Sequence, residues 1–105
     1  MAEKSRWQIY MDLQRAKDQA DKLYEAASSI SGEADRFETC MSEVKHAWEG
    51  ENAAKFTNKM GQVSEDLVKM EKKLEETADT IRKNAERIYN AEMEAKRLAD
   101  IRNHS

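Results

Sequence analysis

His46-Ala47-Trp48-Glu49-Gly50-Glu51-Asn52 is the one stretch of this 105-residue chain where a long helical pattern stops and another begins. Gly50 can adopt backbone conformations that are closed to other residues, and Trp48 brings a large apolar ring that can cover the end of a helical core. Glu51 and Asn52 carry side chains that suit the positive, N-terminal end of a helix. The sequence therefore predicts a tight turn over 48–51 between two helices.

The arm before this turn is predicted to be a helix over about residues 6–47. Ser5 and Gln8 have the spacing of a capping box, which marks the first turn of a helix. Apolar or small residues then follow at gaps that alternate between four and three, the heptad spacing of packed helices. This stripe consists of Ile9, Leu13, Ala16, Ala20, Leu23, Ala27, Ile30, Ala34, Phe37, Met41 and Val44.

The arm after the turn is predicted to be a helix over about residues 52–99, followed by a frayed tail over 100–105 with little apolar material. Thr77 and Asn84 are polar members of its stripe, and Ala78 and Ala85 beside them keep that side apolar. The stripe, with the same heptad spacing, consists of Phe56, Met60, Val63, Leu67, Met70, Leu74, Thr77, Ile81, Asn84, Ile88, Ala91, Ala95 and Leu98.

The two arms together predict an all-α fold, a single domain over 1–105 that forms an antiparallel two-helix hairpin. The absence of proline and the 37% of charged residues agree with long helices. Gly32 and Gly61 interrupt the arms, and we interpret each as a local bend or a close approach of the helices.

Additional apolar residues beside the two stripes predict a second contact surface, because a two-helix hairpin has no third layer to shield its flanks. We therefore expect a dimer that forms a four-helix bundle, either with a second copy or with a similar small protein. The candidate dimer-interface residues are Tyr10, Tyr24, Ala78, Ala85 and Met93.

Charge and hydropathy argue against several classes of partner. The net charge of −3 is spread over interspersed acids and bases, with no basic stripe that could follow a nucleic acid. No apolar run approaches the roughly 20 residues that span a bilayer, and the N-terminus lacks the apolar region of a cleaved signal peptide. A mixed, slightly acidic polar face also disfavours binding to a lipid surface.

Residues that could carry catalysis or bind a metal do not converge in this sequence. Cys40 is the single cysteine, so no disulfide can form within the chain, although Cys40 could cross-link two chains. His46 and His104 have no ligand-spaced partner nearby. We therefore expect no enzyme activity, no metal and no cofactor.

The turn also carries a family resemblance. Trp48-Glu49-Gly50, followed by Glu51-Asn52-Ala53-Ala54-Lys55-Phe56, resembles the WXG (ESAT-like) family of small proteins that type VII secretion systems export. The resemblance implies a Gram-positive bacterium, folding as a dimer in the cytoplasm and secretion without a cleaved signal peptide. It also implies recognition by the secretion ATPase, a role as effector, adaptor or secretion component in virulence, and an aromatic Phe56 that packs below the turn.

The resemblance further implies an export signal in the C-terminal helix. The family's usual form is Tyr followed four residues later by Asp or Glu, but Tyr89 has Met93 at that position. A looser form with a hydrophobic residue in place of Tyr fits Ile88 and Glu92, so the export-signal candidates are Ile88, Tyr89 and Glu92. Glu92 can equally be an ordinary solvated acid.

Two other functions remain open from the sequence. One is a cytosolic chaperone, of the same fold, for the helical N-terminal domain of a larger secreted toxin. The other is an unrelated structural coiled-coil hairpin.

Overall fold

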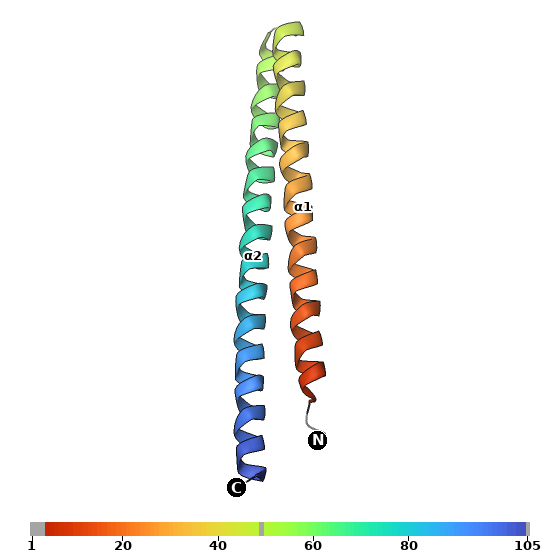
Figure 1. The fold of residues 1–105 in the computed structure, drawn as a ribbon. Helices are drawn as coiled ribbons and strands as arrows, with labels where there is room; N and C mark the ends of the chain where they lie inside the picture. The colour runs from red at the N-terminus through yellow and green to blue at the C-terminus, as the bar shows by residue number, and fades with distance from the viewer. Residues whose placement is uncertain (1–3, 49, 105) are drawn as a thin grey trace. The chain divides into compact units, whose positions relative to one another are not determined.

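Two helices make up the computed structural model, which describes residues 4–48 and 50–104. α1 spans Arg6–Ala47 and α2 spans Glu51–Asn103, and the two are joined by the short connection around Gly50 (Figure 1). The described residues contain no strand. The predicted all-α, two-helix hairpin is confirmed, while the four-helix bundle stays a prediction.

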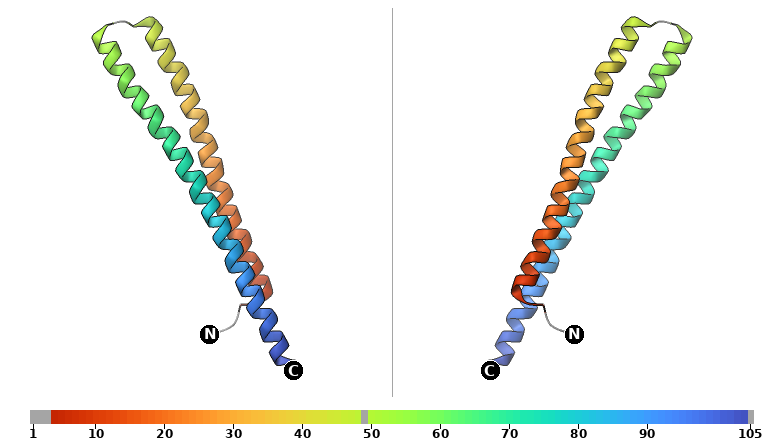
Figure 2. Two further views of the ribbon diagram at one scale, coloured as in Figure 1. Left: turned by 90° about the vertical axis from the view of Figure 1, so that its left-hand side faces the viewer. Right: turned by 90° about the vertical axis from the view of Figure 1, so that its right-hand side faces the viewer.

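The chain divides into two compact units, each with a segment of both helices. The chain-end unit consists of Met1–Lys22 and Thr77–Ser105, and the turn unit is Leu23–Glu76. In each unit a segment of α1 lies beside a segment of α2 that runs in the opposite direction (Figure 2). Each unit therefore has its own packing and its own surface.

The apolar stripe of α1 faces α2, as predicted. Ile9, Leu13, Ala20, Ala27 and Ala34 are buried, and the remaining members of the stripe are half-buried. A heptad stripe stays on one side of a helix, so the stripe members from Ile9 to Val44 all contribute to the packing of α1 against α2.

The buried face of α2 differs from the prediction. Its buried residues are small: Ala53, Ser64, Ala78 and Ala85. Only alternate members of the predicted stripe, Met60, Leu67, Leu74 and Ile81, lie half-buried along this face. The physical reason is that small residues let two helix backbones approach closely, so α1 lies along the side of α2 where the small residues are.

The other alternate members of the predicted stripe are on the surface. Val63 is 41% exposed and Met70 is 53% exposed in the turn unit, and Leu98 is 49% exposed in the chain-end unit. Ile88, one heptad after Ile81, departs from the half-buried row and is 56% exposed. The predicted period was therefore right, but the predicted inward direction of these large residues was wrong.

One polar residue belongs to the buried face of α2. Ser64 is buried, and its Oγ donates a hydrogen bond to Glu38 Oε1 of α1 at 3.3 Å. Satisfying a buried hydroxyl in this way offsets the cost of removing it from water. Ser64 is thus accommodated in a row of alanines without an unpaired polar atom.

The first turn of α1 has the predicted capping box. Ser5 Oγ accepts from the Gln8 backbone N–H at 3.1 Å, and Gln8 Oε1 accepts from the Ser5 backbone N–H at 3.0 Å. These bonds satisfy two of the donors that a helix start leaves open.

The last turns of α2 extend beyond the predicted end near residue 99. The helix continues to Asn103, whereas the sequence predicts a frayed tail from Asp100 onward. Arg6 at the start of α1 pairs with the Asp100 carboxylate, and the His104 backbone N–H donates to the Asp100 carbonyl at 3.2 Å. The Arg6 pair ties the last turn of α2 to α1, and the His104 bond continues the backbone hydrogen bonding at the end of α2, so the helix persists past residue 99. Ser105 lies outside the described residues.

Gly32 and Gly61 do not mark close approaches of the helices. A Cβ built on either glycine would meet no atom within 4 Å. The interpretation of these glycines as points of close helix contact is therefore wrong.

Candidate functional site

The turn of the hairpin depends on the backbone of Gly50. Its φ of +113° lies in a region that side-chain-bearing residues rarely adopt. α1 ends as the Trp48 backbone N–H donates to the Val44 carbonyl at 2.9 Å, and α2 begins as the Ala54 N–H donates to the Gly50 carbonyl at 3.1 Å. Gly50 is thus the N-cap of α2. Glu49, between Trp48 and Gly50, lies outside the described residues.

Trp48 and Phe56 form an aromatic pair across this turn. Their ring centroids are 5.8 Å apart and the planes are inclined at 55°, within the range of favourable aromatic contacts. Trp48 nevertheless keeps 47% of its surface exposed and Phe56 keeps 39%. The turn unit therefore presents two large rings that pack against each other and whose remaining exposed surface a partner can contact.

The export-signal candidates lie on α2 in the chain-end unit. Ile88 is exposed, whereas Tyr89 and Glu92 are half-buried. All three line one open surface hollow, together with Lys4 and Asp12 from the start of the chain. The C-terminal signal candidates and the N-terminal residues thus belong to a single surface.

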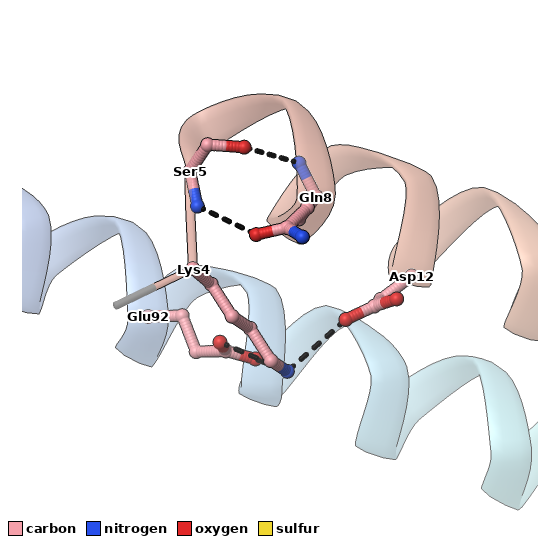
Figure 3. Close-up of polar contacts among 5 residues, drawn as sticks. All are labelled: Lys4, Ser5, Gln8, Asp12 and Glu92. Carbon is pink, nitrogen blue, oxygen red and sulfur yellow. Dashed lines mark hydrogen bonds and ion pairs between the residues drawn. The ribbon is translucent and has the colours of Figure 1, made fainter. Parts of the chain in front are cut away.

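Lys4 bridges the two helices in this hollow (Figure 3). Its Nζ lies 3.0 Å from Asp12 Oδ2 on α1 and 3.3 Å from Glu92 Oε2 on α2. The hydrogen bonds to Asp12 and then to Glu92 raise the pKa of Lys4 above its ordinary value. We call Lys4, Asp12 and Glu92 the Lys4 bridge.

The sequence pattern did not single out Lys4 and Asp12. The capping box fixes Ser5 as N-cap, and Lys4 directly precedes it, so the start of α1 holds the Lys4 backbone in place. The pairing with Glu92 additionally requires the register of the two antiparallel helices. A capping box predicted at one end of a hairpin could have directed attention to Lys4, but not to its partner.

The candidate dimer-interface residues have different surroundings. The Tyr10 ring is 46% exposed and lies 6.4 Å from the Trp7 ring, whereas Tyr24 and Met93 are half-buried. Ala78 is fully buried within the chain-end unit, with 0% exposure, whereas Ala85 is 9% exposed and lines the hollow that also holds Ile88, Tyr89 and Glu92. An interface through Tyr10, Tyr24 and Met93 stays a prediction.

Over residues 4–48 and 50–104, no group of three or more His, Cys, Asp or Glu side chains is placed to hold a metal ion. Cys40 is a free, exposed thiol. Neither helix, over the same residues, has the length of apolar sequence that a membrane crossing needs. What the turn and the hollow offer chemically is binding, through exposed rings, aliphatic side chains and a carboxylate.

Comparison with known proteins identifies a family. No curated protein and no solved structure matches the chain. A family described as proteins of 100 residues with WXG matches residues 8–93, a range that includes Trp48, Gly50, Ile88, Tyr89 and Glu92. This match covers well over half of the chain, and with the helical hairpin closed at Trp48 and Gly50 it shows that the chain belongs to the WXG100 family.

Proposed function

We propose that this protein is a substrate of a type VII secretion system, exported as an effector, adaptor or secretion component. The observation that carries the proposal is the family membership over residues 8–93, since WXG100 proteins are small helical proteins of the type VII substrate kind. Export takes the protein out of the cytoplasm of a Gram-positive bacterium, with recognition by the secretion ATPase and no catalytic step by the protein itself.

In this proposal Ile88, Tyr89 and Glu92 are the export signal. Their shared hollow in the chain-end unit supports the assignment, because it combines an exposed aliphatic side chain, an aromatic ring and a carboxylate within little more than one helical turn. Such a combination suits a partner with an apolar pocket and a basic side chain. Trp48 and Phe56 form a second recognition surface at the turn.

Pairing with another helical hairpin is the second part of the proposal. Phe56, Val63 and Met70 lie seven residues apart on α2, hence on one side of the helix, and each is at least 39% exposed. We call these three residues the apolar line. Large apolar side chains repeated along one helix face are typical of a helix–helix interface, and WXG100 proteins are known to pair with similar small helical proteins.

A secretion assay tests the signal assignment. Glu92→Ala and Trp48→Ala are compared with wild type for the fraction of protein released into the medium by cells with an intact system. Loss of a charge-assisted contact should lower recognition of Glu92→Ala by about tenfold or more. The matched control is Glu94→Ala, which removes an acid that pairs with Arg97 outside the hollow. Equal release of Glu92→Ala and Glu94→Ala would exclude Glu92 from the signal.

The second candidate function is a chaperone for the helical N-terminal domain of a larger secreted toxin. The exposed apolar line favours it as well, because a toxin domain with a matching helix face could cover Phe56, Val63 and Met70 in place of a second copy. The purified state separates the two functions. A stable homodimer favours the substrate, and a protein that behaves well only with a co-expressed partner favours the chaperone.

A further inference from the structure

The carboxylate proposed as part of the export signal is already occupied by a cation of the same chain. Lys4 Nζ lies 3.3 Å from Glu92 Oε2 and 3.4 Å from Glu92 Oε1, so it faces both oxygens (Figure 3). The Glu92 side chain is 27% exposed. A basic side chain that approached Glu92 from outside would therefore meet an acid whose charge is partly offset by Lys4.

We propose that Lys4 is an internal competitor that masks Glu92 until a basic side chain of the export machinery displaces it. The inference rests on the proposed role of Glu92 in the export signal and adds a regulatory contact to it. An arginine suits the incoming role, because a guanidinium binds a carboxylate through both oxygens, the same two atoms that Lys4 faces.

Asp12 makes this displacement possible at low cost. Lys4 Nζ is closer to Asp12, at 3.0 Å, than to Glu92, at 3.3 Å. When Lys4 leaves Glu92 it therefore keeps the Asp12 carboxylate of α1 as a partner and is not left without a counter-charge. One ammonium group contacts both Asp12 and Glu92 in the structure, so it can release Glu92 while it keeps Asp12.

The capping box limits how far Lys4 can move. Ser5 is bonded to Gln8 in both directions, at 3.0 and 3.1 Å, so the backbone next to Lys4 is fixed to the first turn of α1. Lys4 can change its partner by rotating its side chain, while the start of the helix stays in place. The contact is therefore local and does not depend on unfolding of the N-terminal end.

The expected effect is modest, because Lys4 and Asp12 are about half exposed and exposed ion pairs are weak. Masking of this kind should lower the affinity of a partner for Glu92 by about twofold to fivefold at low salt. It should fade as ionic strength rises. Lys4 thus tunes recognition and does not block it.

Binding of the full-length protein to the purified soluble domain of the type VII secretion ATPase from the same organism tests the inference. Lys4→Gln should bind about twofold to fivefold more tightly than wild type at low salt. The matched control is Lys22→Gln, which removes an exposed lysine of α1 in the same unit and should bind like wild type. Circular dichroism checks that both variants remain helical.

Asp12→Asn provides the opposite perturbation. It removes the alternative acceptor, so Lys4 should hold Glu92 more strongly and ATPase binding should weaken. In a Lys4→Gln background the same Asp12→Asn change should have little effect, and this non-additivity shows that Asp12 acts through Lys4. A simple loss of negative charge near the partner would instead weaken binding equally in both backgrounds.

The outcomes separate the inference from the proposed function. If Glu92→Gln weakens binding but Lys4→Gln binds no better than wild type, the masking role is overturned and the signal role of Glu92 stands. If Glu92→Gln binds the ATPase like wild type, Glu92 is not part of the signal and both fall. Tighter binding by Lys4→Gln that disappears in the Lys4→Gln/Glu92→Gln double variant supports masking.

Discussion

Replacing Met70 by lysine should weaken a dimer formed through the apolar line of α2 while leaving the hairpin folded. Met70 is 53% exposed, so its side chain contributes only in part to packing within the chain. Lysine has nearly the same helix propensity and length as methionine, so α2 should be unaffected. The change places a charge at the last position of the apolar line, in the proposed contact with a second copy, where removing a charge from water is unfavourable.

The size of the effect follows from the exposed fraction of Met70. Full burial of a methionine side chain contributes about 1.5–3 kcal/mol, and with 53% still exposed about half of this, roughly 0.8–1.6 kcal/mol, remains available per copy. A symmetric dimer counts the residue twice, giving about 1.6–3.2 kcal/mol. The dissociation constant should therefore rise by about 15-fold to 200-fold, before any cost of burying the charge is added.

Sedimentation equilibrium over a range of micromolar concentrations measures this dissociation constant. The matched control is Val68→Lys, because Val68 is also exposed, at 44%, but lies two residues from Met70 and so on nearly the opposite side of α2. Val68→Lys should dimerise like wild type. Equal weakening by both substitutions, or no weakening by Met70→Lys, would refute the assignment of the interface to the apolar line. A wild-type protein that is monomeric throughout would favour a heterologous partner.

Three further substitutions test the fold itself. Gly32→Ala should stabilise the protein by about 0.5–1 kcal/mol, since α1 gains helix propensity and the added Cβ meets no atom within 4 Å. Gly50→Ala should destabilise the protein by about 1–3 kcal/mol, because alanine does not readily adopt the positive φ of Gly50. Thermal unfolding would contradict this reasoning if the two changes had the same sign. The hydrogen bond from Arg6 lowers the pKa of Asp100 below its ordinary value of 3.8. The Arg6–Asp100 pair therefore contributes fully to stability above the ordinary pKa, and this contribution is lost as the pH falls through the lower pKa of the folded state. Asp100→Asn should therefore remove part of the acid sensitivity of amide exchange in the last turn of α2; an unchanged pH profile would exclude the Arg6 contact as its cause.

Local chemistry predicted the turn and the first helix well. The capping box at Ser5 and Gln8 and the conformational freedom of Gly50 concern residues that are close in sequence, and such effects depend little on the rest of the fold. The stripe of α1 was also assigned to the correct face, because its large and small apolar residues share a single heptad pattern.

The face of α2 could not be assigned from hydrophobicity alone. Heptad counting weights Val63 and Met70 above Ala53, Ala78 and Ser64, although the smaller residues are the buried ones. Burial within the chain is decided by how closely two backbones approach, which favours small side chains. The Lys4 bridge was missed for a related reason, since the register that brings Lys4 to Glu92 is a property of both helices together.

The disagreement on α2 gives information about partners that neither sequence nor fold gives alone. A sequence pattern does not distinguish the apolar residues that pack within the chain from those that pack against another molecule. The structure distinguishes them, because only the first group is buried. On α2 of the turn unit, the small residues Ala53 and Ser64 are buried against α1, whereas Phe56, Val63 and Met70 keep 39–53% of their surface exposed. A heptad repeat of large side chains that packing within the chain leaves exposed has a cost in water unless a second surface covers it. The exposed half of the stripe is thus the part of the sequence pattern that the hairpin does not explain, and it is the reason to expect a helical partner along α2.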